Sequence, residues 1–218
     1  MDTEAAPRRQ APAEEWANSA SHALAFLLAA AAGPVWWQVS RDRGDPLLHS
    51  AAVSVFVLTA MALYAASAIC HALPQGAAKA WFDRADRAAI YLFIAGTYTP
   101  FAAASLAAGG TRGWWLLAAV WVAALAGTAL SMGVPTLPAR WSMAAYLGMG
   151  WLVLAAALPV AAAGPGAVMV WLLAGGAAYS AGAVLFMASG RLRFAHLGWH
   201  LMVMLGSLLH GVAVWHTG

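Results

Sequence analysis

The chain has 218 residues, of which 63% are hydrophobic and only 9% are charged, with a formal net charge of +3 at pH 7. A soluble domain carries about a quarter charged residues, so this composition excludes an ordinary soluble enzyme or binding module. The apolar runs are continuous and do not alternate with polar residues, which argues against a membrane β-barrel. The sequence therefore predicts an all-α integral membrane protein.

Seven hydrophobic runs follow one another along the chain, each close to the roughly 20 residues that a membrane-spanning helix needs. Segments rich in glycine, proline and charged residues separate them, as turns between helices do. We expect a seven-helix bundle with helices at 16–38, 48–71, 87–108, 113–133, 138–160, 166–188 and 194–216. Residues 1–15 are polar and rich in alanine and proline, so we expect a flexible tail at 1–15 and one transmembrane domain at 16–218.

Lysine and arginine residues are unevenly divided between the two ends of this predicted bundle. Eight lie on the side of the N-terminal tail: Arg8, Arg9, Lys79, Arg84, Arg87, Arg140, Arg191 and Arg193. Three lie on the other side: Arg41, Arg43 and Arg112. The positive-inside rule then predicts a cytoplasmic N-terminus, and seven spans put the C-terminus outside. Because these basic residues lie in loops and do not form one patch, we expect no nucleic-acid partner.

The last hydrophobic run begins with the segment RFAHLGWH, in which His196 and His200 are four residues apart. That spacing puts both imidazoles on one face of a helix, one turn apart. An imidazole is costly to bury in a membrane unless it has a partner. The predicted topology brings His71, at the end of the second span, and Asp86, in the first turn of the third, to the same depth.

Three histidines with one open position are a zinc-binding arrangement typical of catalytic sites. Zinc would lower the pKa of a bound water molecule, and Asp86 would hold that water, act as a general base or orient a histidine. Ser67 shares a helix face with His71 and would donate a hydrogen bond there, whereas Cys70 points about 100° away and is a poor ligand. Two other interpretations stay open at this point: histidines bonded to backbone carbonyls, and a proton relay.

Other polar residues have simpler interpretations. Glu15, Asn18 and His22 lie at helical spacing at the start of the first span, where we favour helix capping and an interfacial anchor over a role beside the metal or at the entry to the site. His210 lies about 15 Å beyond His200 along the helix, so we expect a packed, hydrogen-bonded side chain. The segment GTYTPF at 96–101 predicts a kink that widens a cavity beneath the site.

Four segments together resemble the hemolysin III family, the bacterial branch of the progestin and adipoQ receptors. They are EEWANSASHALA at 14–25, SAICHAL at 67–73, DRADRAAIYLFIAGTYTPF at 83–101 and HLGWHLMVMLGSLLHGVAV at 196–214. The resemblance implies seven helices, a cytoplasmic N-terminus, and zinc held by His71, His196 and His200. It also implies roles for Ser67 and Asp86. Arg87 departs from the family pattern, in which a histidine is common, and so does Cys70, where we would expect an aromatic residue.

The resemblance extends to a superfamily that includes ceramidases and so suggests a zinc-dependent hydrolase of lipid amides or esters. We expect a multi-pass protein of a bacterial-type inner membrane, with membrane lipids as partners. One alternative is a non-enzymatic sensor of membrane state with structural zinc, and another is a proton or ion pathway. We disfavour cytolysis, because the sequence has no removable signal and no long amphipathic helix with a basic face.

Overall fold

A computed structural model of the chain describes residues 8–41, 46–107, 112–134, 138–152 and 166–216. Seven helices, and no strand, are found in these residues. The helices are α1 (Pro12–Arg41), α2 (Pro46–Ala72), α3 (Ala77–Ala107), α4 (Arg112–Gly133), α5 (Ala139–Trp151), α7 (Ala167–Ala188) and α8 (Ala195–Trp215).

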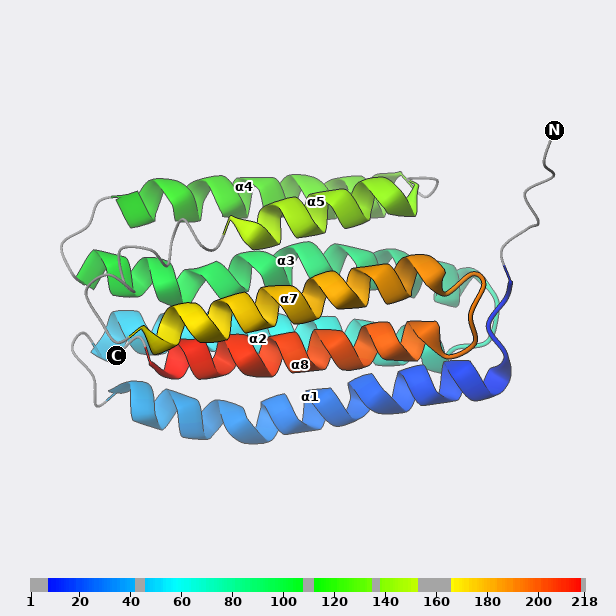
Figure 1. The fold of residues 1–218 in the computed structure, drawn as a ribbon, viewed down its shortest axis with the longest axis horizontal. Helices are drawn as coiled ribbons and strands as arrows, with labels where there is room; N and C mark the ends of the chain where they lie inside the picture. The colour runs from blue at the N-terminus through cyan, green and yellow to red at the C-terminus, as the bar shows by residue number, and fades with distance from the viewer. Residues whose placement is uncertain (1–7, 42–45, 108–111, 135–137, 153–165, 217–218) are drawn as a thin grey trace.

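The helices lie side by side along the long axis of the molecule (Figure 1). α1 packs on α2 and α8, α7 packs on α8, and α3 lies between α2 and α4. The start of α1 and the α2–α3 and α7–α8 connections lie at one end of the bundle, and the C-terminus lies at the opposite end (Figure 1). The end of α2 and the start of α8, which carry the candidate histidines, therefore lie at the same end.

Six of these helices are long and apolar enough to cross a membrane: α1, α2, α3, α4, α7 and α8. The predicted all-α membrane bundle is confirmed. The predicted fifth span is described only over the 13 residues of α5, fewer than the roughly 20 residues that span a bilayer. Its remainder, 153–160, lies outside the described residues, so a seventh crossing stays a prediction.

The third helix begins ten residues earlier than the predicted start at residue 87. α3 starts at Ala77, and Asp86 lies nine residues further along, so the predicted position of Asp86 in the first helical turn is wrong. The hydrophobic run marks only the part of a helix that lies in lipid, whereas a helix also continues through polar residues. Here an ion pair one turn apart, between Arg87 and Asp83, supports the extension, with 2.6 Å between nitrogen and oxygen.

The first helix has its polar residues facing the protein. Its buried residues include Glu14, Asn18, His22 and Ala25, which fall on one face at helical spacing. Leucines on other faces of α1, such as Leu24, are exposed. Lipid is the solvent for this helix, so an apolar outer face costs nothing and the polar groups find partners inside the bundle.

Glycines let α7 and α8 approach closely and so set the position of α8. A Cβ atom on Gly182 would lie 2.8 Å from a ring carbon of Trp199, and one on Gly206 would lie 2.6 Å from the ring of Tyr179. Both distances are shorter than real contacts allow. Small residues at helix interfaces are the usual means of tight packing in membranes. The helix that carries His196 and His200 is therefore held in register by α7.

Candidate metal centre and adjoining cavity

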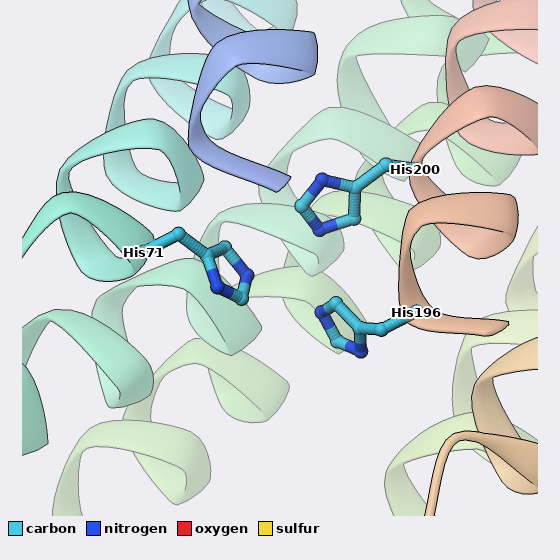
Figure 2. A group of neighbouring side chains, drawn as sticks. All are labelled: His71, His196 and His200. Atoms are coloured by element: carbon cyan, nitrogen blue, oxygen red, sulfur yellow. The ribbon is translucent and has the colours of Figure 1, made fainter. Parts of the chain in front are cut away.

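Three imidazole rings meet between α2 and α8, as Figure 2 shows. His71, His196 and His200 each offer a ring nitrogen, and these three atoms lie within 4.8 Å of one another. The ring centroids are 4.8 to 5.0 Å apart. His200 is buried, and His71 and His196 are half-buried. The three histidines are close enough to hold a metal ion.

The ring of His71 is oriented by a carboxylate from α1. His71 Nδ1 lies 2.7 Å from Glu15 Oε2, and the same oxygen accepts a hydrogen bond from Lys79 Nζ at 3.0 Å. A carboxylate only accepts, so Nδ1 must carry the proton and Nε2 is left with a lone pair. A carboxylate behind a histidine is a usual arrangement in zinc sites, where it sets the tautomer and raises the basicity of the ligand.

The ring of His200 is oriented by the backbone of α1, the helix that also carries Glu15. His200 Nδ1 lies 3.2 Å from the carbonyl oxygen of Asn18 and 3.2 Å from Ser21 Oγ. The carbonyl accepts, so Nδ1 donates and Nε2 again remains for a ligand. His22 stacks on His200 with 3.7 Å between ring centroids and 6° between planes. α1 therefore orients two of the three candidate ligands.

A second carboxylate of α1 holds the start of α8. Glu14 is buried and accepts two hydrogen bonds from the Arg8 guanidinium, at 2.6 and 2.7 Å. It also accepts one from the backbone N–H of Phe194 at 2.7 Å. The hydrogen bond from Arg8 to Glu14 raises the pKa of the arginine, so the guanidinium stays charged. A carboxylate at a helix N-terminus is favourable, and here it positions α8 two residues before His196.

An apolar cavity lies in the core of the bundle beside the triad. Its volume is about 80 Å³ for the centres of water-sized molecules. Its walls include His22, Ser67, Asp86, Thr97 and Tyr98. Thr97 and Tyr98, from the segment GTYTPF, form part of the wall, whereas the predicted kink and its widening of the cavity stay predictions.

Several buried polar atoms of this cavity have no hydrogen-bond partner among the described residues. They are both ring nitrogens of His22, the hydroxyl of Ser67 and Nδ1 of His210. Nε2 of His210 does have one, the carbonyl oxygen of Leu172 at 3.3 Å, as expected of a packed histidine. Buried polar groups are nearly always paired. Several unpaired polar atoms in one cavity therefore indicate a binding site for a polar ligand or for water.

The structure separates the predicted site residues into two groups. His71, His196 and His200 form the triad, whereas Asp86 and Ser67 line the cavity. Among the described residues, Asp86 does not belong to the group that could hold the ion.

The neighbouring residues that depart from the family pattern do not join the triad. Arg87 pairs with Asp83 on its own helix. Cys70 is buried and is not in the metal group found among the described residues. Its carbonyl oxygen accepts a hydrogen bond from Lys79 at 2.8 Å.

Sequence reasoning undervalued the start of α1. Helix capping and anchoring were the favoured interpretation for Glu15, Asn18 and His22, yet all three contact the triad through the bonds and ring stacking described above. Glu14 was not considered. The sequence does show that Glu14, Asn18 and His22 follow one another at intervals of four residues. That spacing puts them on one face of α1, and the structure shows that this face is buried.

A family model described as haemolysin-III related matches residues 10–211. The chain belongs to the hemolysin III family. It is 33% identical to hemolysin-3 of Bacillus cereus over 196 residues, which is 90% of this chain and 88% of the relative. It is also 34% identical to the hemolysin-3 homolog of Bacillus subtilis (strain 168) over 205 residues, or 89% of each.

Membership of the hemolysin III family fits the six apolar helices, and together they make this chain a multi-pass protein of the bacterial inner membrane. The matched residues extend from Gln10 to Gly211, within α8, so they include the triad and the α1 residues that contact it.

Proposed function

We propose that this hemolysin III family member is a zinc-dependent hydrolase of lipid amides or esters. His71, His196 and His200 would hold the ion. The observation that carries the proposal is the convergence of three imidazoles, two with Nε2 left free, beside an apolar cavity with a carboxylate on its wall. A bound zinc ion supplies Lewis acidity and lowers the pKa of a coordinated water molecule.

The cavity walls support a substrate with a hydrocarbon chain and an uncharged polar group. Aromatic and aliphatic residues make up most of the wall, and the lining residues that the structure describes include no lysine or arginine. A phosphate head group would find no cationic partner there. An acyl chain would displace water from the apolar wall, and the amide or ester group would lie near Ser67 and Asp86.

The polar residues of the cavity have separate tasks in this proposal. Asp86 takes a proton from the attacking water and returns it to the leaving amine or alcohol. Ser67, whose hydroxyl has no partner among the described residues, donates a hydrogen bond to Asp86 or to the substrate. His22 donates a ring N–H to the substrate carbonyl oxygen, where negative charge develops as water attacks.

The first test is metal content, measured by mass spectrometry on detergent-purified protein. We expect about one zinc per chain in the wild type, since three histidines fill one tetrahedral site with one position open. The variant His196→Ala/His200→Ala should lose it. His216→Ala is the matched control, because this exposed histidine lies just beyond α8, away from the triad, and should leave the content unchanged.

Zinc-loaded protein is then incubated with a panel of N-acyl and O-acyl lipids. Release of free fatty acid that disappears in Asp86→Asn supports the hydrolase. Zinc retained without turnover on any lipid would contradict it and leave a structural metal in a sensor of membrane state. Wild type that binds no metal in chelator-free buffer would remove the basis of the proposal.

A second candidate, a proton pathway, is favoured by a series of polar groups that continues from the triad into the core. His22 contacts the ring of Tyr64, the hydroxyl of Tyr179 lies 3.2 Å from Ser207 Oγ, and Tyr179 contacts His210. This candidate predicts proton flux in liposomes that is lost in His200→Ala. Absence of flux in the wild type excludes it.

A further inference from the structure

A second hollow lies at the end of the bundle where α1 starts and α2 ends. We call it the vestibule. Its volume is about 450 Å³ for the centres of water-sized molecules. It is lined by Gln10, Pro12, Glu15, Trp16, Ser19, His71, Ala72, Leu73, Pro74, Gln75 and Lys79. His71 is the triad member on its wall, so the vestibule borders the candidate metal centre.

The other surroundings of the triad are poor routes for an ion. The cavity beside it is lined mainly by apolar side chains, and the outer faces of the helices contact lipid. A hydrated divalent cation would lose its water at high cost in either place. The described residues that line the vestibule include several with polar side chains, and one of them, Glu15, is hydrogen-bonded to His71.

Charge in the vestibule is balanced by one ion pair. Lys79 Nζ lies 3.0 Å from Glu15 Oε2, with both side chains only partly exposed. A cation entering the vestibule is attracted by Glu15 and repelled by Lys79. The lysine also donates to the carbonyl oxygen of Cys70 at 2.8 Å, which keeps its charge beside the end of α2 and next to the ligand His71.

We propose that the vestibule is the port through which the metal ion reaches and leaves the triad, with Glu15 as its attracting group and Lys79 as its opposing charge. This inference rests on the proposed metal site. It assigns the opening at the end of the bundle to the ion and leaves the apolar cavity to the substrate. A port changes the rates of binding and release, whereas the triad sets the affinity.

The test labels Gln75, an exposed residue of the vestibule wall. In Gln75→Cys, the new thiol is treated with a cationic trimethylammonium-ethyl or an anionic sulfonatoethyl methanethiosulfonate of similar size. Cys70, the one native cysteine, is buried, and wild type treated in the same way is the control. Unlabelled Gln75→Cys is the reference, because the labelled samples are made from the same folded variant.

Zinc uptake by the metal-free protein and zinc removal by a chelator are followed with a fluorescent zinc indicator. We expect the cationic label to slow uptake by about tenfold relative to the anionic label, and the difference to shrink at high salt. Lys79→Met should speed uptake, and that gain should also shrink with salt. Stoichiometry in the labelled samples should stay that of the reference.

The outcomes separate this inference from the proposed function. If zinc binds stoichiometrically but its uptake and removal rates do not change with either label or with Lys79→Met, the port is overturned and the metal site remains. A wild type that binds no zinc overturns the metal site itself. Rates that follow the sign of the label support the port.

Discussion

Two hollows of different character lie near the triad. The cavity is strongly apolar and carries Asp86, Ser67 and His22 on its wall. The vestibule has more polar side chains on its wall, among them Glu15 and Lys79, and lies at the end of the bundle where α1 starts. In the proposed function, the metal ion comes from water and the acyl chain of the substrate comes from lipid. The metal site therefore needs one surface suited to each. The comparison therefore predicts that residues of the cavity govern chemistry and residues of the vestibule govern the metal.

The largest effect is expected on the cavity side at Asp86. Asp86→Asn removes the proton acceptor and should lower turnover by about 10²- to 10⁴-fold, with the zinc content unchanged. Turnover on the best lipid of the panel and metal content are measured on the same sample. Asp83→Asn, one turn earlier on α3 and exposed, is the control and should keep its activity. Loss of zinc in Asp86→Asn would contradict the assignment of chemistry to the cavity and of metal binding to the vestibule side.

His22 provides a second test on the cavity side. His22→Phe keeps a flat ring against His200 but removes both ring nitrogens, so it should lower turnover by about 10²- to 10³-fold if the N–H serves the developing oxyanion. The zinc content should not change. Full activity in this variant would show that the unpaired nitrogens of His22 serve no substrate.

The vestibule side should behave in the opposite way. Glu15→Gln weakens the acceptor behind His71, and the zinc affinity should fall by about 10- to 100-fold. Turnover at saturating zinc should stay near the wild-type value. Competition with a chelator of known affinity measures the first quantity, and lipid hydrolysis measures the second. An unchanged affinity would mean that the contact between Glu15 and His71 does not support the ion.

The smallest effect is expected for the stability of Ser67→Ala. The hydroxyl of Ser67 is buried beside Asp86 and makes no well-formed hydrogen bond among the described residues, so its removal costs at most a weak hydrogen bond and relieves a desolvated group. The thermal midpoint of the metal-free protein should not fall. Ser54 on the same helix donates to the carbonyl oxygen of Ser50 at 2.8 Å, and Ser54→Ala is the comparison. A clear drop for Ser67→Ala would reveal a partner for the hydroxyl.

Much of the fold could be predicted because lipid imposes a simple rule on sequence. Long apolar runs must be helices, since no water is present to satisfy the backbone, and the expected spans agree with α2, α4, α7 and α8 to within two residues. The rule fails where a helix leaves the lipid. The start of α3 at Ala77 was missed for this reason, because residues such as Lys79 and Asp83 interrupt the apolar pattern without interrupting the helix.

The candidate ligands could be predicted because histidines are rare and costly in lipid, and because helix ends alternate between the two sides of the membrane. His71, His196 and His200 followed from spacing and topology, and the structure brings their rings together. The contacts of the α1 residues did not follow. A carboxylate near a helix start is equally suited to capping the helix, and only the packing of α1 on α2 and α8 decides that Glu15 reaches His71.

By itself the sequence determined the membrane location, the helical class and the three histidines that share one end of the bundle, because hydropathy and helical period are local properties of a chain. The tertiary structure decided which polar groups meet. It left Asp86 outside the group that could hold an ion, gave Glu14 and Glu15 different partners, and placed Asp86 on the wall of the apolar cavity and His71 on the wall of the vestibule. Those results depend on the rotation and register of each helix. Close packing such as that at Gly182 sets both, and a local sequence pattern does not predict them.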